Sequence, residues 1–387
     1  MMTEELQINK SKRTARFLRG ACGLLFVLFS FVYQFFFQHD VVLLLHHSLS
    51  EGKTTYNMFW GSLTVTLLLW LFCSLLNKLC KFKGLLYSYS FFPAYLFLGV
   101  ITDVGYAVAH GEGVASYWTW LFPLLFFVWI LLGKLLQGIC DYYQSFIENR
   151  VLFNINLLIF LLFSFLTVSL GNHQIQFHHE LAVEAALKQR NYDEAYKVGV
   201  KQENPSRTLT ALKCYAFSRQ QRLGDYLFEI PQLYGVSGLL IEDGNSQTLK
   251  ITADSLYTYL GSRPLKGESA MGFFHRLCVD EEGTHVVLDY YLSALLLDKK
   301  LDEFVKQFNL LYLETDEKLP RYYEEALFLD AQQHGKEALM KRNWSPELLE
   351  RWKSYEESKK RYAYNVGEGN WMQREQGRTY WWYYEYR

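Results

Sequence analysis

Long apolar stretches dominate the first half of the chain, whereas charged residues recur every few positions from Asn172 onward. A helix needs roughly 20 mostly apolar residues to cross about 30 Å of hydrocarbon. Five stretches meet this requirement, and the change in composition after them marks a domain boundary. We therefore expect a membrane domain over residues 16–171, with transmembrane helices at about 17–37, 58–76, 85–106, 117–136 and 151–170.

Basic residues alternate with these stretches in a way that predicts an orientation. They gather before the first stretch, between the second and third, and between the fourth and fifth: Lys10, Lys12, Arg13, Arg16, Arg19, Lys78, Lys81, Lys83, Lys134 and Arg150. The other two connections contain only Lys53. Cytoplasmic segments of membrane proteins carry the excess of Lys and Arg. We expect residues 1–15 to be cytoplasmic and the second half of the chain to lie on the outer side.

The second half has the apolar periodicity of short amphipathic helices. In "HHELAVEAALKQRNYDEAYKVGV", an apolar stripe ends at Arg190 and restarts at Tyr192, which predicts two helices joined by a tight turn. "SALLLDKKLDEFVKQF" repeats this pattern, with Leu301 in the place of Tyr192, 109 residues later. That offset is close to three tetratricopeptide repeats of roughly 34 residues.

Residues 172–362 are therefore expected to form a tetratricopeptide-like helical domain, and an irregular helical bundle is the alternative. The domain has no run of alternating apolar residues that would indicate a sheet. The predicted fold class is all-α: a five-helix transmembrane bundle followed by a solenoid of helical hairpins.

Residues 363–387 form a tail that ends in "GRTYWWYYEYR". Its candidate binding residues are six aromatic side chains: Tyr380, Trp381, Trp382, Tyr383, Tyr384 and Tyr386. Three interpretations remain open. The tail can pack back on the helical domain and cover its last hairpin, lie in the membrane interface, or bind a partner or a sugar.

Charge and cysteine content argue against two classes of protein. The formal net charge is −1, which argues against a nucleic-acid partner, because nucleic acid requires a basic surface. Six cysteines are too few for a disulfide scaffold. Cys214 and Cys278 could form a disulfide if the second half faces an oxidising compartment.

Histidines and acids on the predicted outer side are the candidates for chemistry. "FQHD" places His39 and Asp40 directly after the first transmembrane stretch, and Asp103 lies near the outer end of the third. The candidate metal ligands are His173, His178, His179 and Glu180, with His110 and Glu112 in a neighbouring outer segment. No spacing among them matches a motif such as H-E-x-x-H, so neither a metal nor another cofactor is expected.

The leading functional hypothesis is a membrane-anchored platform that binds a protein or peptide. The chain lacks a G-x-S-x-G elbow, a phosphate-binding loop and a C-x-x-C pair, so an enzyme is not favoured. One alternative is a glycosyltransferase-like enzyme that acts on a lipid-linked donor at the outer face, with Asp40 and His39 as its acidic or metal site. A second alternative is a transporter component, for which Asp103 is the candidate intramembrane charge.

Three segments resemble an uncharacterised bacterial family: "QHDVVLLLHHSLSEGKTTYN", "SRTLTALKCYAFSRQQRLGDYLFEIPQLYGVSGLL" and "TYWWYY". The resemblance implies several membrane spans joined to a helical, tetratricopeptide-like extracytoplasmic domain. It also implies a location in the bacterial inner membrane, with the lipid bilayer as a partner. It transfers no catalytic residue.

Overall fold

The structure is a computed structural model that describes residues 2–105, 115–144, 148–241, 251–280, 282–312, 318–340, 342–363 and 366–387. Helices make up 76% of the chain, and all regular elements in the described ranges are helical. The chain divides into two compact units, Met1–His178 and His179–Arg387. We call them the membrane unit and the helical unit. The all-α fold class is confirmed.

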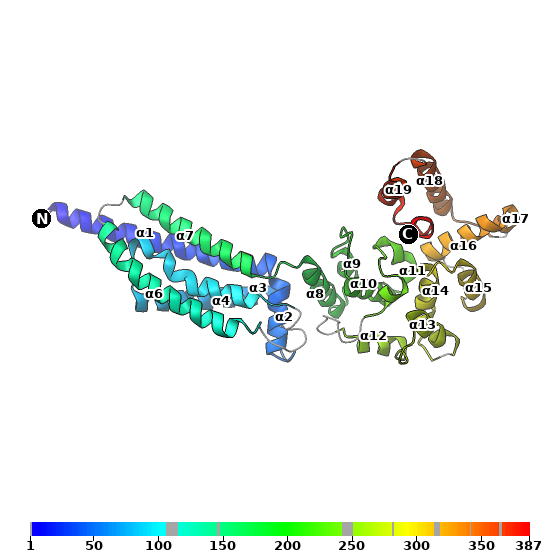
Figure 1. Cartoon of the computed structure of the whole chain (residues 1–387), viewed down its shortest axis with the longest axis horizontal. Helices are drawn as coiled ribbons and strands as arrows, with labels where there is room; N and C mark the ends of the chain where they lie inside the picture. The colour runs from blue at the N-terminus through cyan, green and yellow to red at the C-terminus, as the bar shows by residue number, and fades with distance from the viewer. Residues whose placement is uncertain are drawn as a thin grey trace. The chain divides into compact units, whose positions relative to one another are not determined.

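The membrane unit contains five helical segments that are long and apolar enough to cross a membrane (Figure 1). They are Arg13–Phe37, Met58–Cys80, Gly84–Thr102, Trp118–Cys140 and Asn149–Leu170. The helices that carry them are α1 (Met2–Val32) with the π-turn η1 (Tyr33–Phe37), α3 (Met58–Cys80), α4 (Phe92–Thr102), α6 (Trp118–Gln144) and α7 (Asn149–Leu170). Five helices that could span a membrane are thus present where the sequence predicts them, although the third ends four residues before its predicted limit.

The third span is the most enclosed, because 61% of it is buried inside the unit. It starts with two 3₁₀ turns, η2 (Gly84–Leu86) and η3 (Ser88–Phe91), before α4 continues it. Asn156 on α7 compensates for this irregular start: its Oδ1 accepts from the Ser88 N–H at 2.7 Å, and its Nδ2 donates to the Gly84 carbonyl at 2.9 Å. Non-helical backbone within a membrane requires such buried partners.

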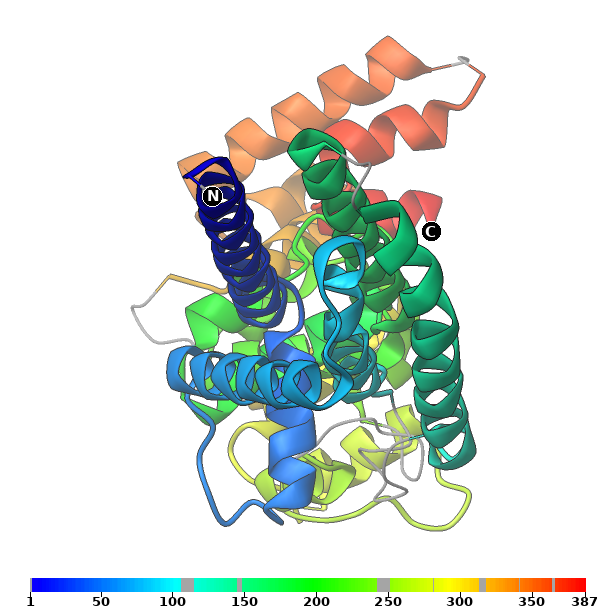
Figure 2. The same cartoon turned by 90° about the vertical axis from the view of Figure 1, so that its left-hand side faces the viewer.

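A short helix, α2 (His39–Leu49), follows the first span directly. In Figure 1 it runs across the direction of the spans, and Figure 2 shows the same chain turned by 90° with α1 seen nearly end on. Val41 and Leu44 on one face are fully buried, whereas Leu49 at its end is exposed. The transverse course is that of a helix that lies along an interface.

The helical unit begins within α8 and continues to the end of the chain. Its helices are α8 (Ile175–Lys188), α9 (Tyr192–Lys197), α10 (Arg207–Arg219), α11 (Leu223–Tyr226), α12 (Ala253–Leu260), α13 (Ala270–Val279), α14 (Val287–Leu297), α15 (Leu301–Leu311), α16 (Arg321–His334), α17 (Lys336–Leu339), α18 (Pro346–Tyr362), α19 (Glu368–Gln376) and α20 (Tyr380–Tyr386), with 3₁₀ turns η4 (Leu227–Glu229) and η5 (Gly235–Leu239).

Three pairs of consecutive helices share one turn geometry: α8–α9, α10–α11 and α14–α15. Arg190, Gln221 and Lys299 occupy the left-handed position after the first helix, with φ of 58°, 55° and 56°. In each pair the next residue bonds back across five residues, as Lys300 N does to Leu295 O at 3.0 Å. These bonds define a Schellman motif. Both helical hairpins that the sequence predicts, α8–α9 and α14–α15, are present. The turn that joins their helices occurs a third time at Gln221, between α10 and α11.

The aromatic tail folds into α20 and packs back into the core of the helical unit. Tyr380 and Trp381 are fully buried. The Trp381 indole N–H donates to the Glu325 carbonyl at 2.9 Å, and the Tyr383 hydroxyl donates to the Leu297 carbonyl at 2.8 Å. The first interpretation of the tail, that it packs back on the helical domain, therefore agrees with the structure.

Cys214 and Cys278 are both free thiols and do not form the disulfide considered from the sequence.

Candidate functional site

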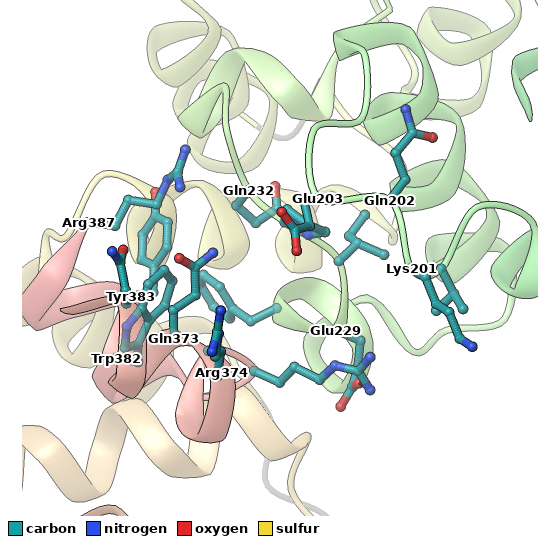
Figure 3. A pocket seen from close by; sticks show the side chains of 17 residues that line it. Lys201, Gln202, Glu203, Glu229, Gln232, Gln373, Arg374, Trp382, Tyr383 and Arg387 are labelled. Carbon is teal, nitrogen blue, oxygen red and sulfur yellow. Dashed lines mark hydrogen bonds and ion pairs between the residues drawn. The ribbon is translucent and has the colours of Figure 1, made fainter. Parts of the chain in front are cut away.

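A cavity of about 430 Å³ opens on the helical unit between segments that lie far apart in sequence. Residues 200–203 and 228–232 line one side. Residues of α19 and the tail, between 370 and 387, line the other (Figure 3). Its volume lies within the range of small-molecule and peptide-side-chain pockets, roughly 300–1,000 Å³.

The floor of this cavity is apolar and rigidly supported. Phe228, Ile230, Trp382 and Tyr383 contribute to it, and each is at most 8% exposed. The Phe228 and Tyr383 rings pack with their centroids 4.8 Å apart. Because the Tyr383 hydroxyl is bonded to the backbone of α14, its ring cannot easily leave the floor. The floor is therefore a preformed apolar surface.

The rim is charged and carries more positive than negative side chains. Four basic and two acidic residues line the cavity: Lys201, Arg374, Arg378, Arg387, Glu203 and Glu229. Glu229 is already paired, since its Oε1 lies 2.6 Å from Arg321 Nη1 and its Oε2 lies 3.3 Å from Arg378 Nη1. The unpaired charge that remains at the rim is predominantly positive, which favours an anionic ligand.

Two buried polar atoms of the lining have no hydrogen-bond partner among the residues that the structure describes. They are the indole Nε1 of Trp382 and the amide Oε1 of Gln232, whose residues are 8% and 4% exposed. The amide Nε2 of Gln232, in contrast, donates to the Leu227 carbonyl at 2.5 Å. Buried polar groups in proteins are normally bonded, so an unmatched donor and an unmatched acceptor indicate where a ligand or water would bind.

In the membrane unit, three of the candidate residues come together at the start of α2. His39 Nε2 lies 3.0 Å from Asp40 Oδ1, and His178 Nδ1 lies 3.7 Å from Asp40 Oδ2. Burial would by itself raise the pKa of Asp40, but the interactions with His178 and His39 outweigh it and lower the pKa. Burial likewise opposes protonation of His178, yet its contact with Asp40 raises the pKa. Each group therefore favours the charged form of the other.

The other candidate metal ligands do not join this cluster. His179 Nδ1 lies 2.6 Å from Gln202 Oε1, Glu180 bonds to Ser206, and His173 is exposed. Among the residues that the structure describes, no group of three His, Cys, Asp or Glu side chains could hold a metal. His110 and Glu112 lie outside the described residues.

Asp103 is the C-cap residue of α4, at the end of the third span. Its Oδ2 accepts from the Trp118 indole at 2.7 Å and from the Tyr117 hydroxyl. These contacts join the end of the third span to the start of the fourth.

The sequence identified only part of the cavity. Trp382 and Tyr383 of the candidate aromatic residues line it, whereas Tyr380 and Trp381 lie in the core. Tyr384 and Tyr386 are half-buried, and the Tyr386 hydroxyl donates to Glu368 at 2.7 Å. The rim charges and Gln232 belong to no motif, so nothing in the sequence indicated that they converge.

The chain belongs to a protein family whose description is "Family of unknown function (DUF6057)". The family's sequence model matches residues 6–265 and 267–387, which is almost the whole chain. This agrees with the resemblance to an uncharacterised family. No curated protein and no solved structure matches the chain.

Proposed function

We propose that this protein is a membrane-anchored binding protein whose helical unit captures a peptide segment of a partner in the 430 Å³ cavity. The observation that carries the proposal is the combination of a buried aromatic floor with a rim of excess positive charge. Aromatic side chains and Arg dominate the energetics of protein interfaces. The five spans would hold this site at the bilayer.

The chemistry of the lining specifies the peptide. One apolar or aromatic side chain would fill the space above Trp382 and Tyr383, and acidic side chains beside it would pair with Lys201 and Arg374. Arg and Lys form charge-assisted hydrogen bonds with carboxylates. The unpartnered Trp382 N–H and Gln232 carbonyl would bond to the peptide backbone, which offers one acceptor and one donor per residue.

The shared turn of the three helical hairpins supports a tetratricopeptide-like origin for this unit. Stacked hairpins bury one face and present a second, often concave face to a partner. The recurrence of the same Schellman turn at Arg190, Gln221 and Lys299 is what such a repeat would retain.

The distribution of basic residues supports a location in the bacterial inner membrane with the N-terminal segment in the cytoplasm and the helical unit outside. Alkaline phosphatase fused after Arg387 is expected to be active, because the enzyme needs an oxidising compartment. The same fusion after Lys81, in the connection between the second and third spans, is expected to be inactive. The reverse pattern would place the cavity in the cytoplasm.

Peptide selection by the full-length protein in nanodiscs tests the binding function. Displayed random peptides are selected on the wild type and on Lys201→Glu/Arg374→Glu, with Lys266→Glu/Lys353→Glu as the control, since both control lysines are exposed and lie outside the cavity. We expect the wild type and the control to enrich acidic peptides with one apolar side chain. The cavity variant should bind the same peptides at least about tenfold more weakly.

Two outcomes would overturn this proposal. The first is equal enrichment of the same peptides by the wild type and the cavity variant. The second is no enrichment by the wild type over empty nanodiscs.

The cluster of His39, Asp40 and His178 supports a second candidate, an enzyme that acts on a lipid-linked substrate at the outer face. An aspartate between two imidazoles is suited to general acid–base chemistry. If this candidate is correct, Asp40→Asn will abolish function in cells, whereas Lys201→Glu/Arg374→Glu will leave it intact. The peptide-binding proposal expects the opposite result.

A further inference from the structure

A second cavity, of about 510 Å³, lies in the membrane unit between the ends of two spans. Most of its wall surface is apolar. Phe29, Val32 and Phe37 from the first span form one wall, and Val168 and Ile175 from the end of α7 and the start of α8 form the other. We call it the span groove.

The position of the span groove determines what can occupy it. Phe29 and Val32 lie within the span Arg13–Phe37, and Val168 lies within the span Asn149–Leu170. Phe37 is 63% exposed, Ile175 is 66% exposed and Val168 is 38% exposed. In a bilayer these side chains face hydrocarbon near the head groups, where lipid chains are the solvent. An acyl chain is therefore the occupant that matches the walls.

One end of the span groove is polar and structurally fixed. Gln38, Asn172, His173 and His178 line it. Gln38 Nε2 donates to the Asn172 carbonyl at 3.0 Å, and His178 Nε2 lies 3.2 Å from the same carbonyl. Since His178 also pairs with Asp40, the polar end is tied to the start of α2.

Gln38 has an unmatched acceptor at this polar end. The residue is 4% exposed, and its Oε1 has no hydrogen-bond partner within the described part of the chain. A buried amide oxygen without a donor costs free energy, which a bound N–H or O–H group would recover. The span groove thus combines apolar walls that fit an acyl chain with a hydrogen-bond acceptor, Gln38 Oε1, that lacks a donor.

We propose that the span groove binds a membrane phospholipid, with one acyl chain between the first and fifth spans and a head group that donates a hydrogen bond to Gln38. A head group with a primary ammonium provides such a donor, whereas the quaternary ammonium of phosphatidylcholine has no N–H. The preferred ligand is therefore a donor-bearing phospholipid such as phosphatidylethanolamine. This lipid site is independent of the peptide cavity.

Photo-crosslinking of the full-length protein tests the site. The protein is placed in phosphatidylcholine nanodiscs that contain a trace of phosphatidylethanolamine with a diazirine in one acyl chain, or phosphatidylcholine with the same labelled chain. Mass spectrometry maps the adducts. We expect them to concentrate on peptides that contain Phe29, Val168 and Ile175, with phosphatidylethanolamine labelling these about fivefold more strongly. That is the factor expected from one hydrogen bond.

Two variants separate the site from general contact with lipid. Val168→Trp fills the groove and is expected to remove these adducts, whereas Leu162→Trp is the control because Leu162 is 52% exposed on the same helix but does not line the groove. Gln38→Met removes the acceptor and should make the two labelled lipids equivalent. Adducts spread evenly over all spans, or unchanged in Val168→Trp, would overturn the proposal and indicate bulk lipid contact only.

Discussion

Two apolar helices, α6 in the membrane unit and α14 in the helical unit, have similar composition and opposite environments. In α6 only 11% of the membrane-length window is buried, and side chains such as Trp120 and Phe127 are more than half exposed. In α14, nine of eleven residues are buried. At about 1.5 Å per residue, α14 is too short to span a membrane, so neighbouring helices must cover it.

The two units keep water away from their apolar side chains in different ways. In the helical unit, the core forms because burial removes apolar surface from water, and the tail rings complete it. The exposed apolar surface of the membrane unit is that expected of spans covered by lipid, and its internal contacts pack the spans and bond the irregular backbone. Asn156 is an example of the second kind.

The two units also differ in where they hold buried charged side chains. Glu325 on α16 is fully buried, and its Oε1 lies 2.9 Å from Arg321 Nε and 3.2 Å from Arg351 Nε. Its Oε2 accepts from the Tyr380 N–H at 2.8 Å. This carboxylate therefore joins α16, α18 and the tail within the helical unit. In the membrane unit, the buried contacts of Asp40 with His39 and His178 lie after the end of the first span.

The largest expected effect distinguishes a tryptophan buried by protein from one that faces lipid. Trp381→Ala should lower the free energy of unfolding of the helical unit by about 3–5 kcal/mol, because it leaves a cavity in the core. Trp120→Ala, at a position 60% exposed, should change stability by less than about 1 kcal/mol. In the full-length protein, hydrogen exchange of peptides from α16 and α20 measures the first effect, and exchange of peptides from α6 measures the second. Equal effects would refute the comparison.

A buried acid in the helical unit should make its stability depend on pH. Burial raises the pKa of Glu180 from 4.5 to about 7. As the pH rises from 4.5 to 7, the unfolded chain loses this proton before the folded chain does, so stability falls. The cost is on the order of 3 kcal/mol. Glu180→Gln should remove this part of the pH dependence of hydrogen exchange in α8, and Glu350→Gln, at an exposed position, should not.

The ion pair in the membrane unit should have a different pH window. Because the pKa of Asp40 is lowered on folding, this group stabilises the folded state above about pH 3.8, and the stabilisation is lost as the pH falls further. Because the pKa of His178 is raised on folding, this group stabilises the folded state below pH 6.5, and the stabilisation is lost as the pH rises through the pKa of the folded state. Between these limits, Asp40→Asn should destabilise α2 by about 1 kcal/mol. An effect of the same size at every pH from 4 to 9, measured by hydrogen exchange of α2 peptides, would contradict this assignment.

The smallest expected effect concerns the repeated turn of the helical unit. Gln221 is exposed and holds a left-handed φ of 55°, which costs free energy for a residue with a Cβ. Gln221→Gly should therefore raise the free energy of unfolding by about 0.5–1 kcal/mol. Gln221→Ala retains the Cβ and should show no such gain. A loss of stability in the glycine variant would mean that the Gln221 side chain itself contributes.

The sequence by itself determined the five spans and the hairpins at Arg190 and Lys299. Span length, apolar composition, helical period and turn position depend on residues close together in the chain, so they can be read without the fold. The change in composition lies at Asn172, seven residues before the two compact units divide after His178.

Only the tertiary structure decided which aromatic rings are buried, that Asp40 meets His178, and that Lys201, Glu229 and Arg374 surround one cavity. These residues lie between about 30 and 170 positions apart. Adjacent aromatic residues have nearly the same local preferences, and only the packing of surrounding helices directs Trp381 into the core and Trp382 to the cavity floor. Long-range contacts of this kind arise from the shape of the packed core, which no local pattern specifies.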